Sequence, residues 1–319
     1  MENQIDSLLE SINMRFPEAR FEIIHNSFSP SLKHFIIRDN YSGKGFGTDH
    51  DCLIAIQKAY SEYVERKTLI QLDKLYGSFK SSNGFAAHLT KSLAKESSIF
   101  ELIERDAFLI AWHSYTAPYW LSDIEIKKIL GDENFLIVNE HNKFNLKLNL
   151  GIVAKSNKVL TCIAKVQGKY KGKDFFFIDT KSGTDLSRIL NSLVEGITFF
   201  SHFLSQSDEH FNRRRGRKLI KPIDHFFYYL NTESEHKWFS KKTSKVIEIP
   251  AVGIQSYIFS PNELLGTLNT NRYVCFSESK EMQSYYCGEF RLNKNININR
   301  FENVFDHNFV FNKSIHPLS

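Results

Sequence analysis

The sequence predicts an α+β protein in which helices pack on a largely antiparallel sheet. Apolar residues recur at helical spacing in four stretches, and runs rich in β-branched and aromatic residues lie between and after them. No Pro/Gly/Ser-rich linker separates these regions, and the sequence contains no repeat of solenoid length. We therefore expect a single domain over residues 1–319.

The N-terminal third predicts three helices and two strands. The leading helix has its apolar residues at Ile5, Leu8, Leu9 and Ile12, which fall on one face. The next helix is expected to take Asp49 as its N-cap, and a polar loop over 77–84 precedes the third. In chain order we expect a helix over 3–14, strands over 20–24 and 34–38, and helices over 49–75 and 90–112.

After Pro118 the pattern changes to short apolar runs separated by polar turn residues, which predicts strands. One further helix is expected over 185–204, capped by Gly183-Thr184-Asp185 and carrying Glu195. The predicted strands cover 135–139, 146–155, 159–167, 174–178, 225–230, 245–249, 253–259 and 272–277.

A glycine-rich stretch, Gly43-Lys44-Gly45-Phe46-Gly47, precedes the predicted helix over 49–75. It lacks the spacing of the dinucleotide fingerprint, and the chain has no G-x-x-x-x-G-K-[ST] loop. Two interpretations stay open: a plain tight turn, or backbone N–H groups that approach an anion ahead of a helix.

The composition is ordinary for a globular protein, with 42% apolar and 24% charged residues. The net charge of +5 is spread along the chain, apart from one basic cluster at Arg213, Arg214, Arg215, Arg217 and Lys218. That cluster fits either a phosphate-bearing or acidic partner or a solvated turn. Because nucleic-acid binding usually needs a broader basic stripe, we expect no nucleic-acid partner.

The four cysteines, Cys52, Cys162, Cys275 and Cys287, form neither a C-x-x-C pair nor a Cys/His metal-binding spacing. We therefore expect reduced thiols. The sequence has no basic N-terminal region followed by an apolar run, and no run of 18 apolar residues. Together these observations predict a cytoplasmic protein with no membrane partner.

A short phrase occurs twice, as Glu62-Tyr63-Val64-Glu65-Arg66 and as Glu101-Leu102-Ile103-Glu104-Arg105. Each copy lies within a predicted helix, where glutamates three residues apart are neighbours and repel each other. Glu–Arg pairs at i,i+4 satisfy one glutamate per copy and leave Glu65 and Glu104 unexplained. A divalent cation that also binds substrate phosphates accounts for the whole set, and a solvated acidic helix face is the alternative.

The order of these motifs resembles the YcaO family, specifically the ATP-dependent, azoline-forming cyclodehydratases that act on ribosomally made peptides of the TOMM or microcin type. The resemblance covers residues 43–319, and residues 1–42 are expected to add a helix and strands to the same unit. Besides the two glutamate phrases, it rests on Ala59-Tyr60-Ser61, Ser82-Asn83-Gly84-Phe85-Ala86-Ala87, Asp106-Ala107, Pro222-Ile223-Asp224-His225, Gln283-Ser284-Tyr285-Tyr286-Cys287-Gly288, Asn299-Arg300 and His316-Pro317-Leu318.

The resemblance implies a YcaO-type fold with an ATP site between helices. It implies Mg²⁺ ligands at Glu62, Glu65, Glu101 and Glu104, ATP contacts at Arg66, Arg105, Lys44, Asn83 and Glu195, and a catalytic C-terminal Ser319. The implied reaction joins a Cys, Ser or Thr side chain to the preceding amide carbonyl of a precursor peptide, with ATP activating the amide oxygen. The product is a thiazoline or oxazoline.

The same resemblance implies partners. These are the precursor peptide itself, an E1-like or ThiF-like protein that binds its leader, and, as a further candidate, a flavin dehydrogenase. The C-terminal residues are expected to reach the active site, with a frayed end as the alternative.

The predicted helix over 185–204 departs from the family pattern, because Glu195 is followed by Thr198 and Phe200 in place of a glutamine and an arginine. The segment between the first glutamate phrase and Ser82-Asn83-Gly84 is also shorter than in the family, and Ala59 stands where serine is common. These departures leave open a degenerate homologue that binds peptide or a partner enzyme without hydrolysing ATP. The four intact glutamates favour the enzyme, because clusters of buried like charge are costly to keep.

Overall fold

The chain divides into two compact units, one formed by Met1–Leu102 and Ile254–Glu278 and the other by Ile103–Gly253 and Ser279–Ser319. The expectation of a single domain stays a prediction. The structure, a computed structural model, describes residues 2–26, 28–40, 43–79, 81–170, 173–206, 238, 243, 245–266, 270–287, 290–305, 309–314 and 316–317.

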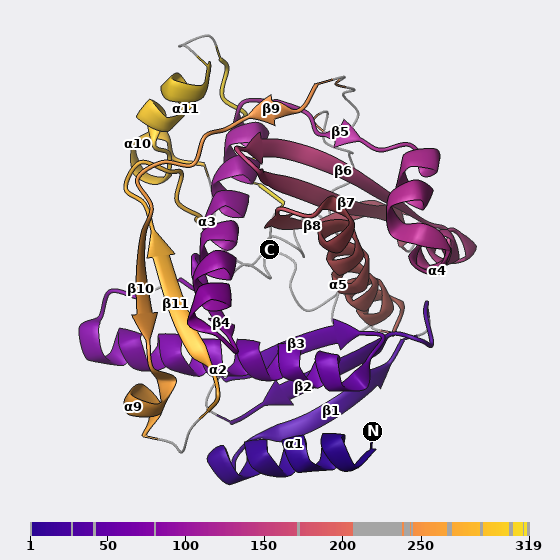
Figure 1. The fold of residues 1–319 in the computed structure, drawn as a ribbon. Coiled ribbons are helices and arrows are strands. Elements are labelled where there is room, and N and C mark those ends of the chain that lie inside the picture. The colour runs from indigo at the N-terminus through magenta and orange to yellow at the C-terminus, as the bar shows by residue number, and fades with distance from the viewer. Residues whose placement is uncertain are drawn as a thin grey trace. The chain divides into compact units, whose positions relative to one another are not determined.

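The first unit contains two three-stranded antiparallel sheets, ordered β1-β2-β3 and β10-β11-β4, and the long helix α2 contacts strands of both (Figure 1). Its elements are α1 (Glu2–Arg15), β1 (Arg20–His25), β2 (Lys33–Arg38), β3 (Lys44–Asp49), α2 (Cys52–Tyr76), β4 (Phe85–His88), the beginning of α3 (Lys91–His113), β10 (Gln255–Phe259), α9 (Pro261–Leu265) and β11 (Tyr273–Glu278).

Helix α2 begins and ends at residues suited to those places. The Asp51 carboxylate accepts hydrogen bonds from the N–H groups of Leu53 and Ile54, at 2.7 and 3.4 Å, so Asp51 is the N-cap. The prediction of Asp49 as N-cap is therefore wrong, because the Asp49 carboxylate accepts instead from the Asp51 N–H and from Lys58. Gly77 ends the helix in the left-handed conformation, at φ 68°.

Residues 44–47 of the glycine-rich stretch lie in strand β3, so the interpretation of the stretch as a plain tight turn is wrong. Glycine is needed because α2 lies directly against this strand. A Cβ atom on Gly45 would come within 2.0 Å of the Ala59 carbonyl oxygen, and one on Gly47 within 1.9 Å of the Ala55 carbonyl oxygen. The glycines thus serve close packing of a helix on a strand.

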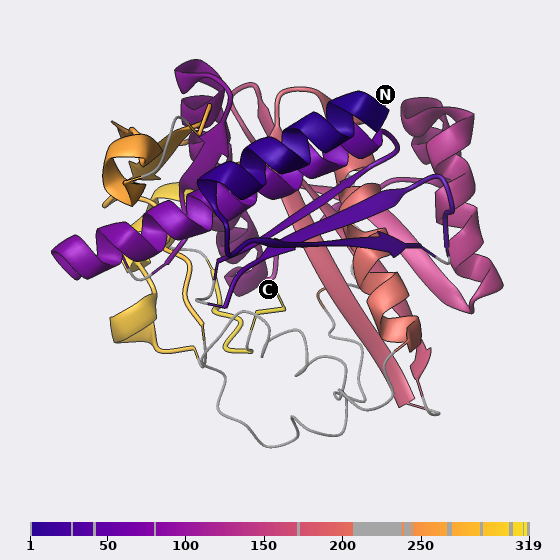
Figure 2. The same ribbon diagram turned by 90° about the horizontal axis from the view of Figure 1, so that it is seen from below.

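Helices α1 and α2 lie beside each other over the same face of the β1-β2-β3 sheet (Figure 2). The core of this unit is aromatic at that point, since the Phe16 ring meets the Tyr63 ring edge-on with centroids 5.2 Å apart. The buried side chains of Phe35 and Ile37 in β2 complete the contact with α2.

The second unit is built on a five-stranded sheet in the order β5-β6-β7-β8, with β9 pairing β6. Only the β6–β9 pair is parallel among the described strands. Its elements are the remainder of α3, β5 (Tyr119–Trp120), α4 (Asp123–Lys143), β6 (Leu146–Ser156), β7 (Val159–Tyr170), β8 (Lys173–Gly183), α5 (Leu186–Gln206), β9 (Ile247–Glu248), α10 (Leu292–Asn295) and α11 (Ile298–Phe305).

Alternating side chains of this sheet serve two cores. Ile163, Phe176 and Ile178 pack with the residues of α3 from Ala107 to Trp112. Phe177 points the other way and meets Phe200 of α5, with ring centroids 6.3 Å apart. Helices α4 and α5 contact each other and this sheet (Figure 1).

The predicted strand over 135–139 is wrong, because these residues belong to α4. A capping box starts the helix: Ser122 and Glu125 each accept a hydrogen bond from the other's backbone N–H. Gly131 then kinks it at φ 75°, which divides the apolar pattern and leaves Phe135–Asn139 looking like a separate short run. Within that run Ile137 and Val138 are buried and Leu136 is 60% exposed.

The predicted α+β class with largely antiparallel sheets is confirmed. The helices expected at 3–14, 90–112 and 185–204 and the strands at 146–155 and 159–167 match α1, α3, α5, β6 and β7 closely. The predicted strand over 225–230, the motif Pro222–His225 and the basic cluster Arg213–Lys218 lie outside the described residues.

His113, at the end of α3, is fully buried and neutral. Its Nδ1–H donates to the Asn312 carbonyl oxygen at 2.7 Å, so its Nε2 accepts from the Tyr286 hydroxyl at 2.8 Å. Burial lowers the pKa of His113 to about 4. The unfolded chain, with a pKa near 6.5, therefore takes up a proton between about pH 6.5 and pH 4 that the folded chain does not.

We expect the stability contributed by His113 to be nearly complete at pH 7.5 and to fall by about 2 kcal/mol on going from pH 7.5 to pH 5. Urea unfolding of wild type and His113→Gln at pH 7.5 and pH 5.0 measures this. The variant should be less stable at pH 7.5 but should lose less on acidification. Equal losses in the two proteins would contradict the assignment.

Candidate functional site

The first unit brings three glutamates together on two helices. Glu62 and Glu65 flank the buried residues Tyr63 and Val64 of α2, and Glu101 lies on α3. Because Tyr63 and Val64 face the core, the carboxylates on either side of them are carried close to it, and both are partly buried.

Glu62 is held by protein groups on both of its oxygens. Oε2 accepts from the backbone N–H of Phe46 in β3 at 3.0 Å, and Oε1 accepts from Arg66 Nη2 at 3.4 Å. The backbone of the glycine-rich stretch does therefore meet an anion, but in this structure the anion is Glu62. The i,i+4 pair expected from the sequence is present.

Glu65 faces a second carboxylate. Burial raises the pKa of Glu65 well above its usual range, and Glu101 adds to this, while Arg66 and the backbone N–H of Ala87 lower it. Burial lowers the pKa of Arg66, but Glu65, Glu62 and Glu101 together raise it. One guanidinium thus meets three carboxylates, and the excess of negative charge in this cluster fits a bound cation.

The second unit surrounds Glu104 with residues of β8. Glu104 is 6% exposed, its Oε1 accepts from the Thr180 hydroxyl at 2.8 Å, and it lies 3.8 Å from Arg105 Nη1. Burial raises the pKa of Glu104, and Asp179 adds to this, whereas Arg105, Lys181 and Thr180 lower it.

Asp179 and Lys181 are the residues of this cluster that the sequence interpretation missed. Burial raises the pKa of Asp179 too, against the effect of Lys181, Arg105 and the Thr180 N–H. The sequence signal that could have found them is the polar run Asp179-Thr180-Lys181, which directly follows the predicted strand over 174–178. This run received no role because only the strands were assigned.

Lys44 and Asn83 lie in the first unit. Lys44 begins β3 and is largely exposed, and its Nζ lies 4.4 Å from the Phe46 ring centroid. Partial burial of its ammonium group and the charge of Arg38 lower the pKa of Lys44, while Glu62 raises it. Asn83 precedes β4, and its Oδ1 is buried with no hydrogen-bond partner among the described residues. Such an acceptor has capacity for a ligand donor.

Glu195 lies on α5 of the second unit and is partly buried. The next residue, Gly196, lets the helix approach the sheet, since a Cβ atom there would lie 3.0 Å from Asp179 Oδ2. Thr198 is fully buried and donates to the Val194 carbonyl oxygen within α5. Thr198 and Phe200, the two departures from the family pattern, thus have structural contacts, and Ser319 lies outside the described residues.

Within the described residues, no group of three or more His, Cys, Asp or Glu side chains converges at metal-binding distance. Mg²⁺ commonly takes only one or two carboxylates, together with water and substrate phosphates, so facing pairs such as Glu65 and Glu101 suit it. The four cysteines are free thiols, of which Cys162 and Cys275 are buried. None of the described helices is both long and apolar enough to span a bilayer.

Several solved structures share this fold. A heterocyclase in complex with substrate and cofactor aligns with a TM-score of 0.68 at 9% identity, over 98% of this chain and 57% of that one. YcaO from Methanopyrus kandleri, bound with AMPPCP and Mg²⁺, aligns with a TM-score of 0.60 at 11% identity, over 100% of this chain and 96% of that one.

A chain of the E. coli microcin synthetase McbBCD complex with pro-MccB17 bound aligns with a TM-score of 0.55 at 13% identity, over 82% of this chain and 88% of that one. No protein-family model and no curated protein matches the sequence. This chain spans just over half the length of the heterocyclase, at 57%. This chain has the fold of YcaO proteins. The fold that the sequence motifs predicted by resemblance is therefore confirmed.

Proposed function

We propose that this chain is an ATP- and Mg²⁺-dependent cyclodehydratase that forms thiazoline or oxazoline rings in a ribosomally made precursor peptide. The observation that carries the proposal is the facing of Glu65 and Glu101, two carboxylates with Arg66 as their nearby positive charge. The similarity in fold to a heterocyclase and to a YcaO protein bound with AMPPCP and Mg²⁺ supports the same conclusion.

In the proposed reaction, the sulfur or oxygen of a Cys, Ser or Thr side chain attacks the carbon of the preceding amide and loses its proton. The amide oxygen takes the γ-phosphoryl group of ATP. Phosphate then leaves with that oxygen, the nitrogen loses its proton, and a C=N bond closes the ring. ATP is needed because an amide oxygen is a very poor leaving group by itself.

The side chains of this chain act through charge and position. Glu62, Glu65 and Glu101 of the first unit and Glu104 of the second would be the residues that hold Mg²⁺, and the metal would supply positive charge to neutralise the triphosphate. Arg66 and Arg105 carry the positive charge that stabilises phosphoryl transfer. Asn83, Lys44 and Glu195 contact the nucleotide, and the role of Ser319 stays a prediction.

The comparison supports a peptide partner, and the further partners are those that the sequence resemblance implies. The similar E. coli synthetase is a complex that was solved with a pro-peptide bound. We infer that this chain likewise works on a precursor peptide presented by an E1-like or ThiF-like leader-binding protein, with a flavin dehydrogenase as a further candidate partner.

Titration of the purified chain with AMPPCP and Mg²⁺ tests the proposal by calorimetry. Binding is expected to require Mg²⁺, and Glu104→Gln should weaken it at least about 10-fold, because it removes one charge from the proposed ligand set. Glu248→Gln, at a glutamate whose side chain is 77% exposed in the same unit, is the matched control and should bind like wild type. A parallel assay should find Mg²⁺-dependent ADP formation once peptide and partner are supplied.

A peptide-binding scaffold without ATP hydrolysis is the second candidate. It is favoured by Thr198 and Phe200, which put a short hydroxyl and an aromatic ring where the family has a glutamine and an arginine. If the chain fails to bind AMPPCP and Mg²⁺ both with and without partner and peptide, the scaffold is the correct function.

A further inference from the structure

The guanidinium of Arg105 lies against an aromatic ring. Its Cζ is 5.2 Å from the centroid of the Tyr285 ring, and its Nη1 is 3.8 Å from Glu104 Oε1. A planar cation over a ring face is restrained in orientation as well as attracted. Tyr285 therefore restrains the orientation of the Arg105 guanidinium next to Glu104.

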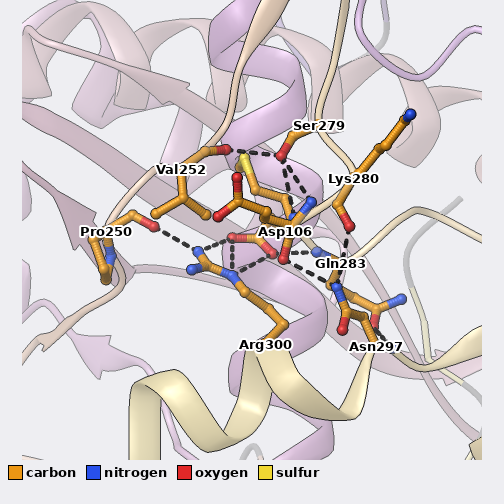
Figure 3. A network of polar contacts seen from close by, with 10 residues as sticks. Asp106, Pro250, Val252, Ser279, Lys280, Gln283, Asn297 and Arg300 are labelled. Carbon is orange, nitrogen blue, oxygen red and sulfur yellow. Dashed lines mark hydrogen bonds and ion pairs between the residues drawn. The ribbon is translucent and has the colours of Figure 1, made fainter.

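The backbone that carries Tyr285 is anchored two residues earlier, at the buried Gln283 (Figure 3). The Gln283 N–H donates to Asp106 Oδ1 at 2.6 Å, and Asp106 directly follows Arg105 on α3. The side-chain amide donates to the Asn295 carbonyl oxygen at 2.7 Å and accepts from the Asn297 N–H at 2.9 Å. Every hydrogen bond of this anchor is buried or partly buried, so the segment has little freedom to slide along α3.

A second anchor acts on the other side of Tyr285. The ring of His316 lies 5.5 Å from the Tyr285 ring, and its Nε2–H donates to the Tyr286 carbonyl oxygen at 2.7 Å. The residues before His316 are fixed to the end of α3, where the Asn312 N–H donates to the His113 carbonyl oxygen at 2.7 Å and the Trp112 indole donates to the Ser314 carbonyl oxygen at 3.2 Å.

We propose that Tyr285 is a positioning residue for Arg105, and that His316 holds Tyr285 in place for this purpose. The inference rests on the proposed function, since it gives Arg105 its task of meeting the triphosphate. It also assigns a task to the C-terminal segment that does not require Ser319: Asn312, Ser314 and His316 support the ring against which the arginine lies.

Affinity for AMPPCP with Mg²⁺ tests the proposal through three variants. Tyr285→Leu removes the ring and is expected to raise Kd by about 3- to 30-fold, the range that a cation–π contact supplies. Tyr285→Phe keeps the ring and should stay within about 2-fold of wild type. The double variant Tyr285→Leu/Arg105→Gln should bind no more weakly than Arg105→Gln alone, because the ring acts only through the arginine.

Two further measurements make the result decisive. Tyr257→Leu, at a tyrosine that is 44% exposed in the first unit, controls for loss of a tyrosine and should leave Kd unchanged. NMR of the Arg105 side chain should show an upfield ring-current shift that Tyr285→Phe preserves, Tyr285→Leu abolishes and His316→Ala reduces.

The proposal is overturned if Tyr285→Leu folds normally and leaves Kd unchanged while Arg105→Gln raises it, or if the two substitutions add in the double variant. If wild type itself does not bind AMPPCP, the proposed function fails, and the ring-current shift still decides whether Tyr285 fixes Arg105. If wild type shows no ring-current shift, the inference about Tyr285 is wrong and the proposed function is unaffected.

Discussion

Arg300→Met is expected to lower the free energy of unfolding by about 3–5 kcal/mol, because it leaves a buried carboxylate without its counter-charge. Arg300 and Asp106 each have side chains that are 1% exposed. Arg300 Nε lies 3.1 and 3.2 Å from the two Asp106 oxygens, and Nη2 also donates to the Pro250 carbonyl oxygen at 2.6 Å (Figure 3). Burial raises the pKa of Asp106 even though Arg300 and the Gln283 N–H lower it.

Urea unfolding of three variants separates the buried pair from an ordinary ion pair. Arg38→Met breaks an exposed pair with Glu22, where the side chains are 58% and 44% exposed, and should cost no more than about 1 kcal/mol. Asp106→Leu/Arg300→Met removes both charges and should lose clearly less than the sum of the single losses. Some loss should remain, because the Gln283 N–H and the Pro250 carbonyl each lose a partner. Additive losses would contradict the buried-pair assignment.

Glu65→Gln is expected to stabilise the chain in the absence of metal and to abolish its affinity for AMPPCP with Mg²⁺. Burial and Glu101 raise the pKa of Glu65, so the folded state holds a proton that the unfolded state releases above about pH 4.3. Losing this proton therefore destabilises the folded state as the pH rises. The neutral amide of Glu65→Gln carries no such penalty. The gain should be larger at pH 8 than at pH 5.

Thermal unfolding with and without AMPPCP and Mg²⁺ measures both effects in one experiment. The ligand should raise the Tm of wild type and leave that of Glu65→Gln nearly unchanged, which corresponds to at least about a 10- to 100-fold loss of affinity. Glu10→Gln, at an exposed glutamate of α1, should respond to the ligand like wild type. A variant that is less stable without ligand, or that keeps the ligand response, would show that Glu65 is a structural residue.

The parts of the fold that the sequence predicted well are those with long, uninterrupted periodicity. Helix α3 and the paired strands β6 and β7 carry their apolar residues at regular spacing and ended within a few residues of the expected limits. Helix α4 was missed because Gly131 interrupts its pattern. Strand β3 was missed because the glycines that admit α2 remove the side chains from which a strand is predicted.

The candidate site was likewise predictable only in part from the sequence. The crowding of carboxylates within each glutamate phrase could be anticipated from helical spacing, whereas the approach of Glu65 to Glu101 is a tertiary contact between α2 and α3. The contribution of Asp179 and Lys181 could not be anticipated, because it depends on β8 lying against Glu104, a tertiary contact between residues far apart in the chain. The same holds for Asp106 and Arg300, whose motifs were noticed separately while their ion pair was not foreseen.

Thr198 limits which side chains its position in α5 can hold. Its hydroxyl closes onto the Val194 carbonyl in a fully buried turn of α5. Thr198→Gln would add two heavy atoms and place a polar amide group in an interior already filled, at a cost of about 1–3 kcal/mol. A glutamine at this position therefore requires smaller neighbouring side chains.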